Sequence, residues 1–176
     1  MTETPQQYST RLSSYVSGEN HLNILRQTPA QIAALLRGKS ERSLIQRPHH
    51  DKWSVAEILA HLAEGEIVFG YRLRMIVATP GIPIQAFDQD LWQNNAGYLQ
   101  KTPREGLKMF SALRSMNVLF LKSLSEDKLG RFGIHAERGE ESIRRMMELY
   151  AGHDVNHLRQ IRSMVKRTRP RPGSKK

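Results

Sequence analysis

Two capping boxes mark where long helices begin in this chain. Ser54-Val55-Ala56-Glu57 and Thr102-Pro103-Arg104-Glu105 each place a hydroxyl residue three positions before a glutamate. In such a box, both side chains hydrogen-bond to amides that the start of a helix leaves free. We expect the first helix to continue to about Val77, because the helix-breaking Thr79-Pro80-Gly81 follows, and the second to end near Leu124.

Apolar residues at helical spacing predict the buried faces of these helices. The main apolar stripe of the first comprises Val55, Ile58, Leu59, Leu62, Phe69, Leu73 and Ile76. The second carries Leu107, Phe110, Leu113, Met116, Leu119 and Phe120. A third long helix, expected to end at about Lys166, has a stripe of Ile143, Met146, Met147, Tyr150, Leu158, Ile161 and Val165.

Shorter elements are expected around these three helices. Thr28-Pro29 is typical of an N-cap followed by proline at the first helical position, which predicts a helix from there to Leu36. Ser40 predicts a cap for a brief turn over residues 41–45, and residues 88–98 predict a short helix. Residues 130–139 are expected to be a loose segment. Because no stretch alternates β-branched with polar residues, we predict an all-α protein, a four-helix bundle with one long crossover connection.

The positive charge is concentrated at one end of the chain. Of the net charge of +10, the residues Lys166, Arg167, Arg169, Arg171, Lys175 and Lys176 supply +6 and leave +4 for residues 1–165. We therefore predict three regions: an N-terminal segment packing on the bundle (1–27), the bundle itself (28–166) and a basic disordered tail (167–176). Since the tail lacks interleaved aromatic residues, a solvated tail is favoured over a nucleic-acid-binding arm.

Composition also limits the chemistry. The chain has no cysteine, so any metal must be held by nitrogen and oxygen atoms, and the protein itself offers no thiolate. No apolar run approaches the roughly 18 residues of a membrane span, and the N-terminal residues 1–8 are polar. We expect a cytoplasmic protein that does not associate with membranes.

A pair of histidines is the main chemical feature. His153 and His157 lie one helical turn apart within the apolar stripe of the last helix, together with Asp154. This spacing suits a divalent metal, and a third ligand is expected from another helix, for which His61 is the best candidate. Asp154 follows the first histidine where zinc proteases carry a glutamate; we expect a buried polar partner there rather than a general base.

Two carboxylates flank His61 on its predicted helix. Glu57 and Glu64 lie four positions before it and three positions after it, so either could bind the metal or accept a hydrogen bond from the ring. The capping box already explains Glu57, and Glu64 is therefore preferred. Arg72, further along the same helix, is a candidate anchor for a substrate carboxylate, although a solvated or ion-paired arginine is the simpler interpretation.

The sequence resembles a known superfamily. Trp53-Ser54-Val55-Ala56-Glu57, His61-Leu62-Ala63-Glu64-Gly65-Glu66, Phe69-Gly70-Tyr71-Arg72-Leu73-Arg74 and His153-Asp154-Val155-Asn156-His157 are similar to motifs of the DinB/YfiT-like superfamily, as is Phe87-Asp88-Gln89-Asp90 of its YfiT-like branch. The resemblance extends from about residue 28 to residue 165. It implies a four-helix bundle in which His61, His153 and His157 bind one divalent metal.

The resemblance also implies candidate activities. Relatives include metal-dependent transferases that use low-molecular-weight thiols such as bacillithiol or mycothiol, and a thiol-dependent maleylpyruvate isomerase. The leading hypothesis is therefore a thiol S-transferase acting on a small-molecule substrate. Its alternatives are a metal-dependent hydrolase and a non-catalytic, stress-related metal-binding bundle. Zinc or nickel is expected, with iron and copper as alternatives that imidazole also suits, and the resemblance implies a homodimer.

Other side chains have two interpretations each. His135 could close over the site or pack as an ordinary loop residue, and Trp92 and Tyr71 could line a pocket or fill the core. Trp53 is expected to pack against the start of its helix. His49 and His50 are expected in an exposed loop. The candidate catalytic residues are Glu64, Asp154 and Arg72.

Overall fold

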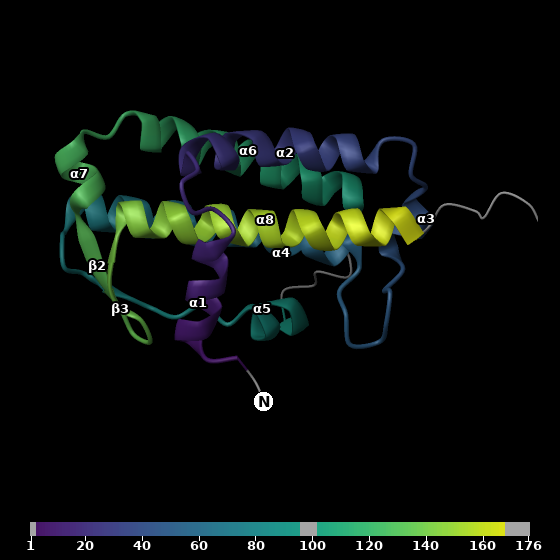
Figure 1. Cartoon of the computed structure of the whole chain (residues 1–176), viewed down its shortest axis with the longest axis horizontal. Coiled ribbons are helices and arrows are strands. Elements are labelled where there is room, and N and C mark those ends of the chain that lie inside the picture. Colours follow the sequence, from purple (N-terminus) through teal and green to yellow (C-terminus); the bar gives the residue numbers. More distant parts are fainter. Residues whose placement is uncertain (1–2, 96–101, 168–176) are drawn as a thin grey trace, which may run out of the picture.

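Four long helices form the body of the protein. The computed structural model describes residues 3–95 and 102–167, and Figure 1 shows the long helices lying side by side. They are α2 (His21–Leu36), α4 (Val55–Ala78), α6 (Pro103–Lys122) and α8 (Ile143–Arg167). The predicted four-helix bundle is confirmed. The proposed basic tail lies outside the described residues except for Arg167, which ends α8.

The crossover connection follows from the direction of the helices. In Figure 1, α4 and α6 run in the same direction, while α2 and α8 run the opposite way. The chain must therefore return along the bundle between α4 and α6. That return includes β1 (Pro83–Ile84) and α5 (Gln89–Asn95). The helices α4 and α8 contact each other more sparingly than the α4–α6 and α2–α8 pairs do.

Both predicted capping boxes are present, but the predicted start of α2 is wrong. Asn20 is the N-cap, so the helix begins at His21, with Pro29 in its interior. The proline cannot donate to the carbonyl of Leu25, four residues earlier. Arg114 on α6 donates to that carbonyl instead, at 2.9 Å, and the Thr28 hydroxyl donates back to Ile24. A tertiary contact thus permits a proline inside the helix, and the expected boundary at residues 27/28 falls within α2.

A small sheet at one end of the bundle was not predicted. The segment expected to be loose contains β2 (Phe132–His135) and β3 (Gly139–Ser142), which pair antiparallel after the short helix α7 (Glu126–Gly130). The strand β1 pairs with β2 in parallel. Strands of two to four residues are too short to show a period-2 pattern, and the β1–β2 pair joins segments about 50 residues apart. The brief α3 (Glu41–Ile45), capped by Ser40, is confirmed.

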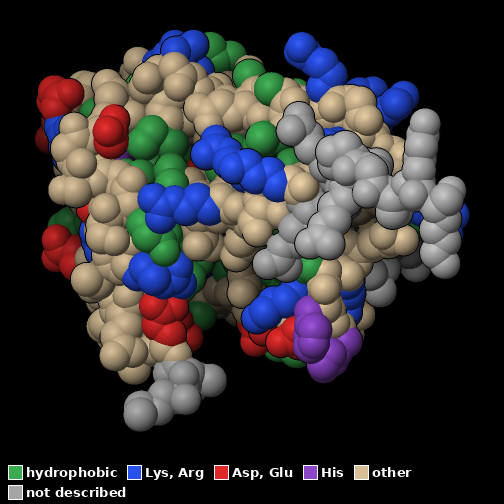
Figure 2. Space-filling model, turned by 45° about the vertical axis from the view of Figure 1, so that its right-hand side comes forward, with side chains coloured by type: hydrophobic (Ala, Val, Ile, Leu, Met, Phe, Trp, Pro, Cys, Tyr) green, Lys and Arg blue, Asp and Glu red, His purple; other side chains and the backbone are tan. Residues whose placement is uncertain are grey.

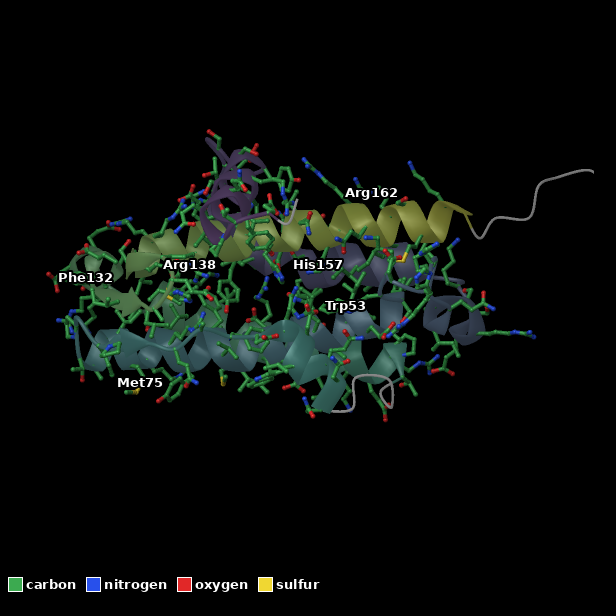
Figure 3. All side chains as sticks on the ribbon, turned by 90° about the horizontal axis from the view of Figure 1, so that it is seen from below. Trp53, Met75, Phe132, Arg138, His157 and Arg162 are labelled. Carbon is green, nitrogen blue, oxygen red and sulfur yellow. The ribbon has the colours of Figure 1, made fainter. Side chains whose placement is uncertain are left out.

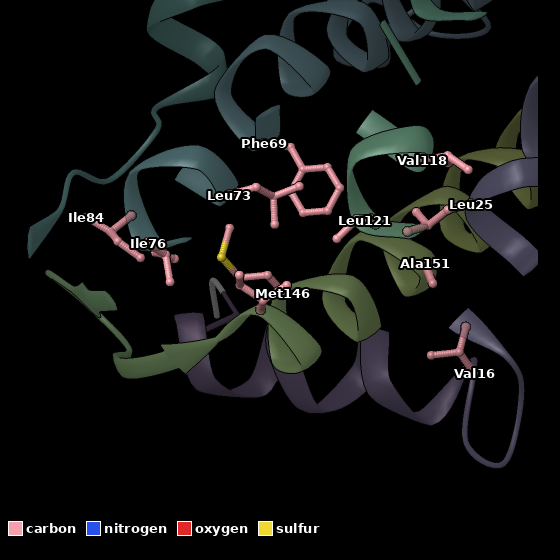
Figure 4. Close-up of a cluster of buried hydrophobic side chains, with 11 residues drawn as sticks. Val16, Leu25, Phe69, Leu73, Ile76, Ile84, Val118, Leu121, Met146 and Ala151 are labelled. Carbon is pink, nitrogen blue, oxygen red and sulfur yellow. The ribbon is translucent and has the colours of Figure 1, made fainter. Parts of the chain in front are cut away.

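The core was predicted well for α4 and less well for α6. Figure 4 shows Phe69, Leu73 and Ile76 of α4 facing buried side chains of the other helices. In α6, however, the predicted stripe residues Met116 and Leu119 are 48% and 65% exposed. The buried face of α6 instead comprises Pro103, Gly106, Phe110, Arg114, Asn117, Val118 and Leu121. Two polar residues, Arg114 and Asn117, therefore lie on the buried face of α6, and neither belongs to the predicted stripe.

The N-terminal helix α1 (Pro5–Ser14) packs across α8, as Figure 1 shows. It begins with another capping box, in which Thr4 and Gln7 exchange hydrogen bonds. That four-residue signal in the sequence was overlooked. The close approach depends on Gly152 of α8, because a Cβ at that position would lie 2.3 Å from the carbonyl oxygen of Leu12.

Gly152→Ala is expected to separate α1 from α8. The clash involves backbone atoms, so it cannot be relieved by a side-chain rotation, and we expect a loss of about 1–3 kcal/mol in stability. Chemical denaturation and amide exchange of residues 5–14 would measure the effect. Gly65→Ala in α4 is the matched control, since its Cβ would meet nothing within 4 Å; this variant should be neutral or slightly stabilised. Equal stability of both variants would contradict the prediction.

Side chains of both charges lie on the face of the molecule that Figure 2 shows. Figure 2 shows Lys and Arg side chains spread over one face among uncharged and hydrophobic ones, with Asp and Glu near its edges. Within residues 3–95 and 102–167, none of the helices combines the length and hydrophobicity needed to cross a membrane.

Candidate metal centre

Three histidines from two helices meet between α4 and α8. The Nε2 atom of His153 lies 2.9 Å from Nε2 of His61 and 3.0 Å from Nε2 of His157. His61 and His157 are buried, and His153 is partly buried. Figure 3 shows His157 and Trp53 near the middle of the molecule's length. The structure thus brings together the three histidines that the sequence singled out, although His61 precedes His153 by 92 residues.

The hydrogen-bonding pattern of these rings suits a cation. Nδ1 of His157 lies 2.9 Å from Oε1 of Gln160. If Nδ1–H donates to that oxygen, Nε2 presents a lone pair to the centre. Nε2 of His153 lies close to two other Nε2 atoms and can carry only one proton. That proton could form a hydrogen bond with one of the two atoms, so the other pair of facing nitrogens would lack a favourable hydrogen bond from His153. Among residues 3–95 and 102–167, the buried Nδ1 of His61 has no hydrogen-bond partner. The donor set therefore fits one divalent metal ion.

Burial keeps the three rings neutral, which metal binding requires. It lowers the pKa of His157 to about 4, although the contact with Gln160 and the charge of Asp154 oppose the shift. The pKa of His61 lies well below its usual value because of burial and then the neighbouring His157. The pKa of His153 is lowered well below its usual value by burial and by His157, His61 and Arg114.

Aromatic rings cover the imidazole of His61. The ring of Trp53 lies 4.9 Å from it between centroids, and the ring of Phe87 lies parallel at 6.4 Å. Trp53 thus packs at the start of α4, as expected, but its contact with a site residue was not foreseen. The ring of Tyr150 lies 6.3 Å from that of His153 and stacks on Phe69 at 3.9 Å, and burial raises the pKa of Tyr150 to about 12. Its phenol is therefore neutral and is not a base at neutral pH.

A buried ion cluster lies beside the histidines. Arg114 of α6 forms ion pairs with Asp154 of α8 and with Glu66 of α4, and all three side chains are at most 2% exposed. Asn117 donates to the Glu66 carboxylate at 3.0 Å. Burial lowers the pKa of Arg114, but the charges of Asp154 and Glu66 outweigh this effect and raise it above its usual value. With one cation and two carboxylates, the cluster carries one net negative charge next to the centre.

Asp154 is thus a buried polar partner, as the sequence suggested, and its partner is Arg114. Sequence analysis missed Arg114 and Asn117. Their spacing from Phe110, four and seven positions on, places them on the same helix face and could have indicated their burial.

The two glutamates near His61 face other groups. Glu57 completes the capping box with Ser54, pairs with Arg47 and accepts from Gln93 at 3.0 Å. Glu64 is not among the residues whose ligand atoms gather with the three histidines in the described part of the chain. It lies instead beside α5, where it lines a shallow pocket with Leu91, Trp92 and Asn95.

A cavity of about 160 Å³ opens next to the histidines. It is bounded by α1, α4, α8, the crossover and the β2–β3 hairpin, and it is lined by Tyr8, Ser9, Leu12, His61, Gly65, Arg72, Phe87, Gln89, His135, Glu137, Arg138, Glu141, Met146, Leu149, Tyr150 and His153. Arg72 and His135, both buried, therefore face the same space as His61 and His153. The contributions of α1 and of Arg138 and Glu141 were not predicted. The cavity is large enough for a small organic molecule.

The remaining candidates lie at the surface. His49 and His50 are exposed, as expected, and form a second group with Asp51, which is also exposed. Trp92 and Tyr71 are 37% and 65% exposed and line a groove beside α4 rather than the core.

Comparison with known proteins agrees with this geometry. A family model of the DinB superfamily matches residues 24–161. A relative from Oceanobacillus iheyensis, named a "putative metal-dependent hydrolase", is 29% identical over 65% of this chain. The match spans 66% of the relative's own length, which is just under two thirds. YfiT of Bacillus subtilis, with the same designation, is 20% identical over 83% of each chain.

A solved structure shows the same fold. The structure of YfiT from Bacillus subtilis, described as "a probable metal-dependent hydrolase with an unusual four-helix bundle topology", aligns with a TM-score of 0.77 at 16% identity. The alignment covers 94% of this chain and 90% of that one.

Proposed function

Since this chain belongs to the DinB superfamily, we propose that it is a metal-dependent enzyme in which His61, His153 and His157 hold one divalent ion. The observation that carries the proposal is the convergence of three Nε2 atoms, with His153 within 3.0 Å of both others. The names of its relatives support a metal. Zinc or nickel suits three imidazoles, as do iron and copper.

We propose hydrolysis as the first reaction class to test. A divalent ion on three neutral imidazoles retains its charge and an open position, and can lower the pKa of water toward about 7. The rings of Trp53 and Phe87 lie beside His61, with centroids 4.9 and 6.4 Å from that of the imidazole. Nδ1 of His135 accepts the backbone N–H of Glu137 at 3.2 Å, so its Nε2–H is a donor on a residue that lines the cavity.

Transfer of a low-molecular-weight thiol is the second candidate. The chain has no cysteine, so any thiolate at this centre must come from outside. The cavity beside His153 has room for such a molecule. Assays with a chromogenic ester, and with bacillithiol plus an aromatic electrophile, would distinguish the two classes. If chelation of the metal unfolds the protein, and if neither reaction is detectable in the metal-loaded protein, the metal is structural.

Metal binding tests the proposal directly. Untagged protein is expected to bind one equivalent of zinc in titration calorimetry and elemental analysis. Each of His61→Ala, His153→Ala and His157→Ala should lose on the order of 100-fold or more in affinity, because loss of a ligand exceeds the effect of losing its supporting contacts.

Two controls accompany these variants. A His49→Ala, His50→Ala double variant removes the exposed histidine group, and His135→Ala removes a cavity residue outside the cluster. Both should retain affinity close to that of the wild type. The proposal is wrong if wild-type protein binds no stoichiometric metal, or if only the double variant loses it.

A further inference from the structure

Arg72 is a buried cation without an acidic partner in the described part of the chain. Its residue exposure is 8%, and its guanidinium donates to the backbone carbonyl of Gln85. No carboxylate lies within ion-pairing distance of it among residues 3–95 and 102–167. Burying an unpaired charge is unfavourable, and most buried arginines are paired. This contrasts with Arg114 on the neighbouring helix, which has two buried carboxylate partners.

None of the described carboxylates that line the cavity forms an ion pair with Arg72. Of the other charged residues that line the cavity, Arg138 pairs with Glu141 through contacts of 2.6 and 3.0 Å. Glu137 is exposed at the rim. His61 and His153 complete the polar side of the cavity and are neutral. The cavity lining thus holds two arginines, Arg72 and Arg138, and two glutamates, and only Arg72 of the two arginines has no ion-pair partner among the described residues. Nε2 of His135 adds a further hydrogen-bond donor.

Part of the remaining cavity wall is apolar, and Tyr8, Ser9, Gln89 and Tyr150 also line it. Leu12, Met146 and Leu149 are buried side chains along one side, and the ring of Phe87 closes another. A pocket with an apolar wall and a few convergent polar groups is the usual form of a small-molecule site. Guanidinium groups bind carboxylate and phosphate oxygens through paired N–H donors.

We propose that this cavity binds a small organic oxyanion, a carboxylate or a phosphoester, whose anionic group pairs with Arg72 while its apolar part lies along Leu12, Met146 and Leu149. That this oxyanion is the substrate rests on the proposed function, because binding in the cavity would place the oxyanion beside His153. The binding of the anion does not depend on a metal. Arg72 is then a specificity-determining residue.

Three probes with one ring and different charges test the proposal. Benzoate, phenyl phosphate and benzamide are titrated into untagged wild-type protein, once after chelation and once loaded with zinc. At least one of the two anions is expected to bind about tenfold or more tightly than benzamide in both forms, and the stronger anion identifies the preferred headgroup. The Arg72 Nε–H resonance should shift with that anion and not with benzamide.

Matched variants locate the charge preference. Arg72→Gln should bring the anion-to-amide ratio to about one, and Arg72→Lys should retain part of it. Arg74→Gln is the control on the same helix, since Arg74 contacts Gly70 and Asn117 instead of the cavity; it should leave the ratio unchanged. Thermal unfolding verifies that each variant is folded.

The outcomes separate the two proposals. If the anions and benzamide bind equally to wild-type protein, if the Arg72 resonance does not respond, or if the preference survives in folded Arg72→Gln, the anion site is refuted. If the preference appears in the chelated protein while zinc does not bind, the anion site stands and the proposed metal centre fails.

Discussion

Arg114→Met is expected to lower the free energy of unfolding by about 3–5 kcal/mol. The substitution keeps most of the side-chain volume but leaves the carboxylates of Glu66 and Asp154 buried without a cation. It also removes the hydrogen bond to the carbonyl of Leu25, to which Pro29 cannot donate because it has no N–H. Denaturant unfolding monitored by circular dichroism would measure the loss.

Two further variants establish the cause of that loss. The triple variant Arg114→Met, Glu66→Gln, Asp154→Asn removes the unpaired charges and should recover part of the stability. Arg144→Met breaks an ion pair with Glu126 whose side chains are 54% and 83% exposed, and should cost less than about 1 kcal/mol. If Arg114→Met costs no more than Arg144→Met, the buried cluster does not stabilise the fold.

Metal-free protein is expected to lose stability as the pH falls from about 6.5 to about 4. Burial lowers the pKa of His157 from its ordinary 6.5 to about 4, so in this range the unfolded chain binds a proton that the folded protein does not. The stabilisation is complete above pH 6.5 and is lost as the pH falls toward 4. His157 alone accounts for about 3 kcal/mol. His61 and His153, whose pKa values are also well below the ordinary value, add losses of the same sign.

Denaturant titrations of chelated protein at pH 7, 6, 5 and 4 would measure this loss. His157→Gln removes one titrating group and should make the fall in stability shallower by about 3 kcal/mol over the range. His49→Gln, a change at an exposed histidine, is the control and should follow the wild type. A His157→Gln curve parallel to that of the wild type would contradict the prediction.

Sequence reasoning succeeded where the deciding interactions are local. The capping boxes at Ser54 and Thr102 were located correctly because each depends on four consecutive residues. The same logic would have found α1 from Thr4 and Gln7. Sequence reasoning failed at Thr28-Pro29, a pair of residues that is typical of a helix start. Arg114 of α6 donates to the carbonyl that the proline leaves without a partner, and α2 therefore begins earlier in the chain.

The sequence by itself determined the helical bundle and the inward position of His153 and His157, because helical periodicity and capping involve neighbouring residues. It indicated His61 through a motif. Only the tertiary structure decided which charges are compensated, since ion pairing depends on residues far apart in the chain. In the tertiary structure, Asp154 pairs with Arg114, and Glu64 lies beside α5. Arg72 faces a cavity instead of pairing with a carboxylate of the described residues.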